Sequence, residues 1–422
     1  MKKLTAVILG YGMRGEAYAK YAVAHPEELE IVSVAEPAED IRKKAQKLHN
    51  IPDNMAFKDW KEIAKLPKIA DFAIISTQDK MHYEPALALI EKGYNLLLEK
   101  PMAPTAKECK EITLAAEKKG VKVIVCHVLR FTPIFCKIKD IIDSGEIGEV
   151  TSVIHAENVG YMHYGHSYVR GNWRNSDESS PMILAKSCHD TDLLQWLIGK
   201  KCTKVQSFGS LRYFKKENKP EGAPDYCSKG CPHADKCLYE PIHFYVEIKE
   251  NPWRDVVAKK VNATDDEIIE ALKEGPYGRC VYECDNNVVD RQVVNMEFED
   301  GCTVSFSMTA MNKGGRFIRI YGTKGELVAY MGAKSVISIY DFETDTIKKF
   351  EVSKINQSIS SGHGGGDTVI MMDTIKTFRG ETPSKSITDV RTSYLNHLIA
   401  FAAEESRLNN TVIDLDEFSE NL

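Results

Sequence analysis

A lysine and a histidine stand three residues apart in the segment PMILAKSCHDTDLLQW, residues 181–196. On a helix, this spacing places Lys186 and His189 on one face, and His189 shares that face with the apolar Leu193. Burying an isolated cation in an apolar core costs free energy, so the pair indicates a chemical site. The competing interpretation is that His189 is a core histidine whose hydrogen bonds are all made, close to an aspartate that caps the helix. In a catalytic site, Lys186 and His189 would be acid–base candidates, because the pKa values of both residue types shift readily.

Another lysine, Lys100, ends the apolar run YNLLLEK and precedes Pro101. The proline prevents the strand from continuing as a regular central ladder, and it biases Lys100 toward an extended conformation. A lysine at the carboxyl edge of a strand, beside a cofactor, can act as an acid or a base. We therefore add Lys100 to the catalytic candidates, against the alternative of an ordinary surface lysine after a strand.

The amino-terminal segment LTAVILGYGMRGEAYAKYA predicts a strand, a glycine-rich turn and a helix. Gly10, Gly12 and Gly15 form the pattern G-x-G-x-x-G, which permits a tight turn, close approach of a pyrophosphate and helix–strand packing. The next apolar run ends at Glu36, about 20 residues further on, where a dinucleotide ribose needs an acid. That acid would repel a 2′-phosphate, so we expect NAD rather than NADP, although the nearby Arg42 keeps NADP open.

Strands and helices then alternate as far as residue 128. Apolar strands in ADFAIIST, YNLLLEKP and VKVIVCHV are separated by the helical segments EPALALIEKG and KECKEITLAAEKKG. This alternation predicts a doubly wound parallel sheet, whose ligands lie beside the carboxyl ends of the strands. The residues at those ends form one predicted crevice: Gly10, Glu36, Ser76, Thr77, Gln78, Glu99, Lys100, Cys126 and His127.

The pattern changes after the first domain, 1–128, and we expect a second domain over 129–385. RQVVNMEFEDGCTVSFSMTAM and FIRIYGTKGELVAYMG predict pairs of strands joined by tight turns. A run of hairpins predicts a large, mainly antiparallel sheet, which makes the whole chain an α/β plus α+β protein. The last part, 386–422, contains an amphipathic helix with the predicted core stripe Leu395, Leu398, Ile399 and Ala402.

A polar and aromatic loop spans residues 157–186. Aromatic rings stack on the C–H faces of sugars, while arginine and histidine donate to hydroxyl groups, so this composition is suited to polyol recognition. The alternative is a surface loop packed by its own aromatic side chains. We predict substrate contacts from residues of this loop and of the later HGGGD segment: Tyr161, His163, His166, Arg170, Trp173, Arg174 and His363.

A cysteine-rich block over about 213–284 has the character of an insertion. Four of its residues are candidate ligands of a structural zinc ion: Cys227, Cys231, Cys237 and Cys280. Their spacing begins as C-x3-C-x5-C, which is wider than in common zinc ribbons, so an iron–sulfur cluster, a disulfide and free thiols are the alternatives. Prolines and glycines predict an irregular knob, in which Thr264 and Glu267 form a capping box at the start of a helix.

Six features of the chain resemble those of the Gfo/Idh/MocA oxidoreductases. They are GYGMRG at 10–15, Glu36, ISTQDKMH at 75–82, LLLEKPMA at 96–103, CHD at 188–190 and RIYGTKGEL at 319–327. The resemblance implies an amino-terminal Rossmann domain, a carboxy-terminal domain on an open, mainly antiparallel sheet, and a last helix near the domain boundary. It also implies NAD(P)-dependent oxidation of sugars, inositols or related polyols in a homodimer or homotetramer.

The resemblance also assigns roles to residues. Lys100 and His189 would flank the substrate. The cofactor-binding set would be Gly10, Tyr11, Gly12, Met13, Arg14, Gly15, Glu36, Ser76, Thr77, Gln78, His82, Glu99 and Lys100. One motif is altered, because Ala185 stands where the family's Asp-x-x-x-His pattern has its aspartate, and Lys186 follows it. A Lys–His pair thus replaces the Asp–His pair, which leaves open whether Lys186 or His189 is the base.

Three functions are compatible with these residues. The first is hydride transfer between a carbohydrate or polyol and NAD. The second is a glycosidase that uses bound NAD in a transient oxidation, elimination and reduction, and the third is an NAD-binding sensor, against which Lys100 and His189 count. A net charge of −6 and a pI near 6.1 do not indicate a nucleic-acid or membrane partner. Eleven cysteines in a long chain without a secretion signal indicate reduced thiols in a cytoplasmic protein.

Overall fold

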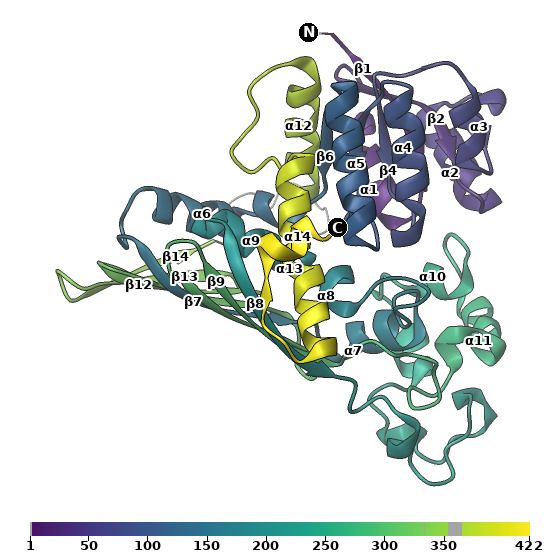
Figure 1. The fold of residues 1–422 in the computed structure, drawn as a ribbon. Helices are drawn as coiled ribbons and strands as arrows, with labels where there is room; N and C mark the ends of the chain where they lie inside the picture. Colours follow the sequence, from purple (N-terminus) through teal and green to yellow (C-terminus); the bar gives the residue numbers. More distant parts are fainter. Residues whose placement is uncertain (1, 333, 353–364) are drawn as a thin grey trace.

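The computed structural model describes residues 2–332, 334–352 and 365–422, and two sheets form the centres of its two domains (Figure 1). The first sheet is parallel, with the strand order β3-β2-β1-β4-β5-β6. Its strands are β1 (Leu4–Leu9), β2 (Leu29–Ala35), β3 (Ala56–Phe57), β4 (Phe72–Ile75), β5 (Asn95–Leu98) and β6 (Val123–Val125). The strand order reverses between β1 and β4, and doubly wound sheets bind their ligands beside such a point.

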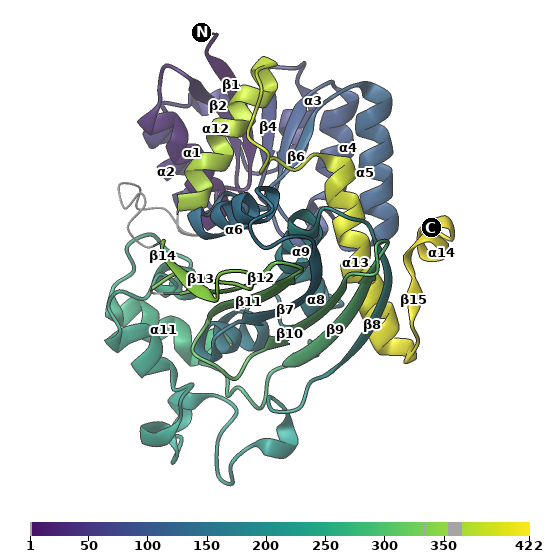
Figure 2. The ribbon, with the colours of Figure 1, turned by 90° about the vertical axis from the view of Figure 1, so that its left-hand side faces the viewer.

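Helices cover both faces of this sheet. The early ones are α1 (Met13–Ala24), α2 (Glu39–His49), α3 (Trp60–Lys65), α4 (Tyr83–Glu91) and α5 (Ala106–Lys119). Another, α12 (Gly366–Arg379), comes from late in the chain and lies beside α1 (Figure 2). Ile370, Met371 and Ile375 of α12 are buried in the same apolar cluster as Ile8 and Phe72 of the sheet. A helix from the predicted second domain therefore packs against the first.

The second sheet has nine strands in the order β14-β13-β12-β11-β7-β10-β9-β8-β15. They are β7 (Val150–Asn158), β8 (Cys202–Ser210), β9 (Arg291–Phe298), β10 (Thr303–Thr309), β11 (Gly315–Gly322), β12 (Gly325–Met331), β13 (Val336–Asp341), β14 (Thr346–Glu351) and β15 (Ile413–Asp414). Strands β7 and β10 pair in parallel, and the other neighbours pair antiparallel. The predicted combination of a parallel sheet and a mainly antiparallel sheet is confirmed.

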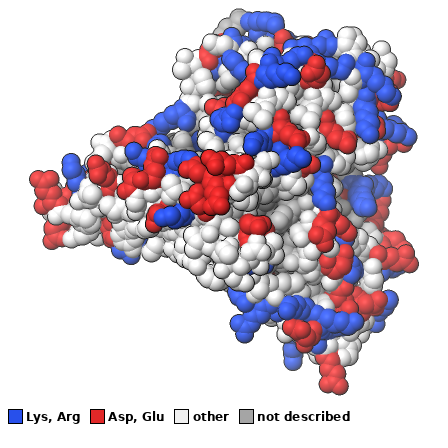
Figure 3. All heavy atoms as spheres, viewed as in Figure 1, with Lys and Arg blue, Asp and Glu red and all other residues white. Residues whose placement is uncertain are grey.

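Among the described residues, helices cover one face of the second sheet and leave the other face open. The covering helices are α6 (Pro133–Asp143), α8 (Met182–Ala185), α9 (Cys188–Ile198) and α13 (Val390–Asn409). On the open face, Ile154, Phe208 and Val293 are 43%, 50% and 44% exposed, although all three are apolar. Phe208 and Val293 are cross-strand partners on β8 and β9. Figure 3 shows a largely uncharged surface below the band of charged residues at the sheet.

Helix α13 lies between the two domains, in contact with α5, α9 and β8. Leu398, Ile399 and Ala402 are buried as predicted, but Leu395 is 38% exposed, so its assignment to the core stripe is wrong. Leu395 therefore lies on a side of α13 that its neighbours leave partly exposed. After α13, β15 and α14 (Leu415–Glu420) pack against β8. No helix within the described ranges is long and apolar enough to cross a membrane.

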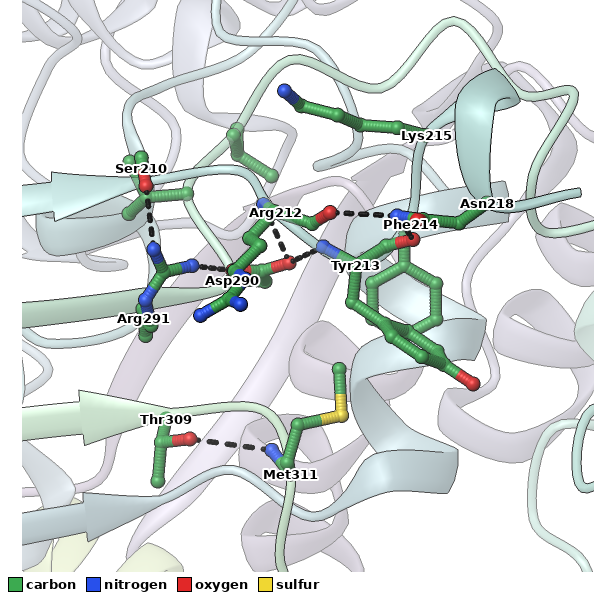
Figure 4. A network of polar contacts seen from close by, with 12 residues as sticks. Ser210, Arg212, Tyr213, Phe214, Lys215, Asn218, Asp290, Arg291, Thr309 and Met311 are labelled. Carbon is green, nitrogen blue, oxygen red and sulfur yellow. Dashed lines mark hydrogen bonds and ion pairs between the residues drawn. The ribbon is translucent and has the colours of Figure 1, made fainter.

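The chain between β8 and β9 forms a long excursion, residues 211–290, which we call the insertion. The carboxylate of Asp290 accepts hydrogen bonds from the backbone N–H groups of Arg212 and Tyr213, over 2.9 and 2.6 Å (Figure 4). The next residue, Arg291, donates to the hydroxyl of Ser210 over 3.0 Å. These bonds hold the two ends of the insertion together at the edge of the sheet.

The insertion has a small core of its own around α10 (Arg254–Ala258) and α11 (Asp265–Glu274). Its buried apolar residues include Phe244, Val257, Ile268 and Leu272. The predicted capping box between Thr264 and Glu267 is confirmed at the start of α11. The cysteine-bearing part, in contrast, is built from three-residue helical turns, as predicted for an irregular knob.

Candidate active site

The predicted dinucleotide turn joins β1 to α1 at the carboxyl edge of the first sheet. Gly10 has a φ of +82°, and a Cβ there would lie 2.8 Å from the carbonyl oxygen of Ser76. A Cβ on Gly15 would lie 2.1 Å from the carbonyl oxygen of Gly10. Gly12 differs, since no atom lies within 4 Å of a Cβ added there. Packing therefore requires Gly10 and Gly15, whereas Gly12 leaves the amino terminus of α1 open to a phosphate.

Glu36 stands at the end of β2, next to this turn. Its carboxylate accepts hydrogen bonds from the backbone N–H groups of Tyr11 and Ala38, over 2.8 and 3.0 Å. Arg42 donates to the carbonyl oxygens of Glu36 and Pro37, over 2.6 and 3.2 Å, so its guanidinium is bound to the backbone. The ring of Tyr11 is buried in the domain core, which leaves its backbone as the part that belongs to the turn.

Several residues of the predicted cofactor-binding set lie at the ends of β4 and β5. The ring nitrogens of His82 are 2.7 Å from the carbonyl oxygen of Pro101 and 3.0 Å from that of Thr77, so His82 joins the two strand ends. Gln78 and Met13 are exposed, and Met13 is at the start of α1.

Glu99 is the buried carboxylate of this region. It accepts from the guanidinium of Arg14 over 2.7 Å and from the hydroxyl of Tyr18 over 2.6 Å. Burial opposes its ionisation, but Arg14 and Lys100 outweigh burial and hold the pKa of Glu99 below its usual value. Arg14 also pairs with Asp367 at the start of α12, over 2.7 Å, and this bond ties the late helix to the dinucleotide turn.

Lys100 connects the two domains. Its ammonium group donates to the carbonyl oxygen of Ala185, at the end of α8, over 2.9 Å. The adjacent Lys186 forms an ion pair with Glu157 of β7, over 3.4 Å. Burial lowers the pKa of Lys186, while the carboxylate of Glu157 opposes that change. The catalytic candidates Lys100 and Lys186 are thus brought together, and the partner of Lys186 comes from the sheet.

A network of buried charges joins the second sheet to α9. Arg316 of β11 lies opposite Glu157 of β7 and contacts its carboxylate over 2.5 Å. The same guanidinium donates to Asp190 of α9 over 2.8 Å, and His155 lies 2.8 Å from the same carboxylate oxygen. Although burial opposes ionisation, Arg316 and His155 hold the pKa of Asp190 well below its usual value.

His189, at the start of α9, is 5% exposed. Its ring meets the edge of the His127 ring, with 6.0 Å between the centroids. His127 stands at the predicted strand end after β6, and its Nε2 atom lies 2.8 Å from the hydroxyl of Ser393 on α13. The predicted third catalytic candidate therefore lies where β6, α9 and α13 meet.

Two family models match the chain. One, described as the oxidoreductase family with an NAD-binding Rossmann fold, covers residues 4–127, and the other, its C-terminal alpha/beta domain, covers residues 139–396. Both describe the same family, and the second match alone spans more than half of the chain.

The chain belongs to the Gfo/Idh/MocA oxidoreductase family. Its relatives include the oxidoreductase YteT of Bacillus subtilis, which is 26% identical over 360 residues, 81% of this chain and 79% of YteT. The scyllo-inositol 2-dehydrogenase (NADP(+)) IolW of the same organism is 29% identical over 171 residues, 40% of this chain and 44% of IolW. Levoglucosan dehydrogenase in complex with NADH and levoglucosan shares the fold, with a TM-score of 0.70 at 17% identity over 98% of this chain and 100% of that chain.

In this Gfo/Idh/MocA member, the polar and aromatic loop packs against the insertion. It forms α7 (Tyr161–Tyr164) and a π-helical turn (Gly165–Arg170). His163 stacks on Trp253 of the insertion, with 5.4 Å between the ring centroids. Burial and the nearby cations, Lys186 foremost among them, hold the pKa of His163 well below its ordinary value. His163 is therefore neutral, and it lies close enough to Lys186 and Lys100 for their charges to act on it.

The other residues predicted to bind substrate join the loop to its neighbours. His166 stacks between Trp253 and Tyr277 of the insertion, at 4.4 and 4.7 Å, and Tyr161 meets Tyr239. Arg170 donates to the carbonyl oxygens of Arg279 and Tyr239, over 2.7 and 2.9 Å, and is 2% exposed.

The end of the loop contacts the first domain as well as the insertion. Trp173 donates to Asp79, after β4, over 3.1 Å. Arg174 forms a two-bonded ion pair with Asp285 of the insertion. His363 lies outside the described residues. Most contacts of the loop over 157–186 thus fit the alternative interpretation, a loop packed by aromatic side chains. Many of the side chains and carbonyl groups that it contacts belong to the insertion.

Sequence reasoning did not single out Glu157, Arg316 or Trp253. Val153, His155 and Glu157 are buried on β7, while Ile154, on the opposite face of the strand, is exposed. This alternation is a local signal that the carboxylate of Glu157 points inward. Arg316 and Trp253 have no comparable local signal, because their partners come from distant parts of the chain.

The four cysteines proposed as zinc ligands line one small cavity, of about 20 Å³, together with Arg170. Across the described ranges, however, no three or more His, Cys, Asp and Glu side chains are grouped so that they could hold a metal ion. The cysteines are free thiols in this structure, and burial raises the pKa of Cys227 to about 12. The zinc site stays a prediction that the four cysteines around one cavity leave to be tested.

Proposed function

We propose that the protein is an NAD-dependent oxidoreductase that transfers hydride between a CH–OH group of a sugar, inositol or related polyol and the nicotinamide. The observation that carries the proposal is the contact of Lys100 with the backbone of Ala185. It brings the acid–base candidates of the second domain to the carboxyl edge of the sheet that holds the dinucleotide turn. The names of IolW and levoglucosan dehydrogenase support a polyol or sugar substrate.

The turn around Gly12 and the carboxylate of Glu36 would hold the dinucleotide, which accepts hydride when it is bound. Two observations favour NAD over NADP. Glu36 presents a negative charge where a 2′-phosphate would lie. Arg42, the nearby cation, is bound to the carbonyl oxygens of Glu36 and Pro37. The Kd values of NAD+ and NADP+, measured by calorimetry, test this preference, and we expect the tighter binding for NAD+.

Oxidation of a hydroxyl group also requires an acceptor for its proton. A base works best when its pKa is near the working pH, and burial moves the pKa of Lys186 in that direction. This favours Lys186 as the proton acceptor, with His189 as the second candidate. Lys100 would then orient the substrate oxygen from the side of the first domain.

The experiment is a single-turnover measurement of NADH absorbance with a panel of inositols, hexoses and anhydrosugars. We expect NADH to form with at least one of them, and to be lost in Lys100→Met and Lys186→Met. If the product lacks its glycosidic group and no net NADH accumulates, the protein is instead a glycosidase with transient oxidation. Tight NAD+ binding without turnover of any compound would favour a sensor.

We also propose that the protein forms a homodimer or homotetramer through the open face of the second sheet. Ile154, Phe208 and Val293 expose apolar surface there, and a second copy of the same face would cover it. Light scattering after gel filtration tests this assembly. We expect Phe208→Glu to shift the protein toward the monomer, because it places a charge in the contact.

A further inference from the structure

Glu157 lies on the second sheet, next to the segment from α8 to α9 that carries Lys186 and His189. It is 2% exposed, near the end of β7, and its cross-strand neighbour on β11 is Arg316. One carboxylate oxygen lies 3.4 Å from the ammonium of Lys186, and the other lies 2.5 Å from the guanidinium of Arg316. Buried carboxylates are costly unless they are paired, and both oxygens of Glu157 are paired with cations.

We propose that Glu157 is the positioning residue of the acid–base site, supplying from the sheet the carboxylate that the helix lacks at Ala185. Its role is to hold the amine of Lys186 in place and to set the pH at which that amine loses its proton. This inference rests on the proposed oxidoreductase function for its catalytic meaning, but the Glu157–Lys186 pair itself can be measured without any substrate.

The surrounding charges assign this role to Glu157. The charged and titratable groups that act on Lys186, or on which it acts, are Glu157 of β7, Asp190 of α9, Arg316 of β11, Lys100 after β5 and His163 of α7. Asp190 is bound to Arg316 and His155, and Lys100 donates to the carbonyl oxygen of Ala185. Glu157 is the carboxylate in an ion pair with Lys186, so its loss leaves the amine facing two neighbouring cations.

The direct test is the pH dependence of amine labelling at Lys186, read by mass spectrometry with a small amine reagent on the full chain. In Glu157→Gln the ammonium loses its stabilising charge, so the labelling curve should move to lower pH by about 1–3 units. Glu326→Gln is the matched control, because Glu326 pairs with Arg319, another arginine of β11. We expect the control to label like the wild type.

A second measurement connects this shift to catalysis. The pH profile of kcat/KM, with NAD+ and myo-inositol or whichever panel compound turns over, should move in the same direction in Glu157→Gln. A merely structural glutamate would lower activity without moving the profile. Should Glu157→Gln not fold, Glu157→Asp keeps the charge at a longer distance, and we expect a smaller labelling shift in the same direction.

Two results separate the inference from the proposed function. An unchanged labelling curve in folded Glu157→Gln overturns the inference, whatever the activity of the protein. A shifted curve in a protein that binds NAD+ but oxidises no compound supports the Glu157–Lys186 pairing and counts against the proposed oxidoreductase.

Discussion

Lys100, after the end of β5, donates a hydrogen bond to the carbonyl oxygen of Ala185, over 2.9 Å. The bond joins the parallel sheet of the first domain to the helical segment of the second, 85 residues later in the chain. Ala185 contributes only its backbone, so the missing aspartate of the family motif does not remove the contact between the domains. It does remove a negative charge from the helix, and Glu157 of the sheet is the carboxylate that pairs with Lys186 instead.

Replacing Lys100 with methionine tests the centre of the proposed site. We expect the rate of hydride transfer to fall by roughly 10²–10³-fold, because Lys100 would orient the reacting oxygen and the loss of one positioned hydrogen-bond donor costs about this much. NAD+ affinity should change little, since the turn around Gly12 is untouched. Single-turnover NADH formation gives the rate, and calorimetry gives the affinity. Wild-type hydride transfer in Lys100→Met would remove this lysine from the reaction.

The glycine turn allows a matched pair of substitutions. A Cβ on Gly12 meets no atom within 4 Å, whereas a Cβ on Gly15 would lie 2.1 Å from the carbonyl oxygen of Gly10. We expect Gly12→Ala to keep its thermal stability but lose NAD+ affinity, because the methyl group occupies the place of a phosphate. Gly15→Ala should lose both. Thermal unfolding and NAD+ titration of the two variants check this, and equal stability in both would contradict the packing argument.

Asp190→Asn tests the buried charge network. The substitution leaves Arg316 without its partner on α9, and breaking a buried ion pair typically costs about 3–5 kcal/mol. The free energy of unfolding in urea should fall by that amount. Glu326→Gln, in the more exposed pair with Arg319, should cost less than about 1 kcal/mol. Similar losses in the two variants would show that burial does not strengthen the Asp190 pair.

Buried histidines predict a loss of stability in mild acid. Burial lowers the pKa values of His166 and His397 to about 3, and it holds those of His127 and His163 well below the ordinary value. Below about pH 6.5 the unfolded chain therefore binds more protons than the folded one, and stability falls as the pH drops toward the folded pKa values.

The expected loss is about 1.4 kcal/mol per pH unit for each such histidine, over the range from about pH 6 to about pH 4. Urea unfolding at a series of pH values measures it. His397→Gln should reduce the slope by the contribution of one histidine, because glutamine has no proton to bind in this range. A free energy of unfolding that stays level between about pH 7 and about pH 5 would contradict this account.

Much of the fold and of the cofactor side could be predicted from local patterns. The turn at Gly10, Gly12 and Gly15 follows from the conformations that glycine alone allows, and these act between near neighbours in the chain. The alternation of strands and helices likewise predicts the parallel sheet and its carboxyl edge. Leu395 shows the limit of such patterns, because α5, α9 and β8 together decide which strip of α13 remains exposed.

The contacts of the predicted substrate-binding residues were harder to predict, since these residues meet their neighbours through packing of distant segments. The loop over 157–186 has the composition of a polyol site, but His166 and Arg170 are held by rings and carbonyl groups of the insertion. The local sequence shows which side chains are present, but their hydrogen-bond and stacking partners come from distant parts of the chain.

By itself, the sequence determined the parallel sheet, the mainly antiparallel sheet and the glycine turn, because periodicity and backbone sterics act over a few residues. It also singled out Lys100, Lys186 and His189 as candidates for the site. Only the tertiary structure decided what these residues contact. The register of β7 against β11 places Arg316 opposite Glu157, and the packing of α8 and α9 on that sheet brings Lys186 to the same carboxylate. Ion pairs are short-ranged in space but not in sequence, so the partner of Lys186 became visible only when strand register and helix packing were known.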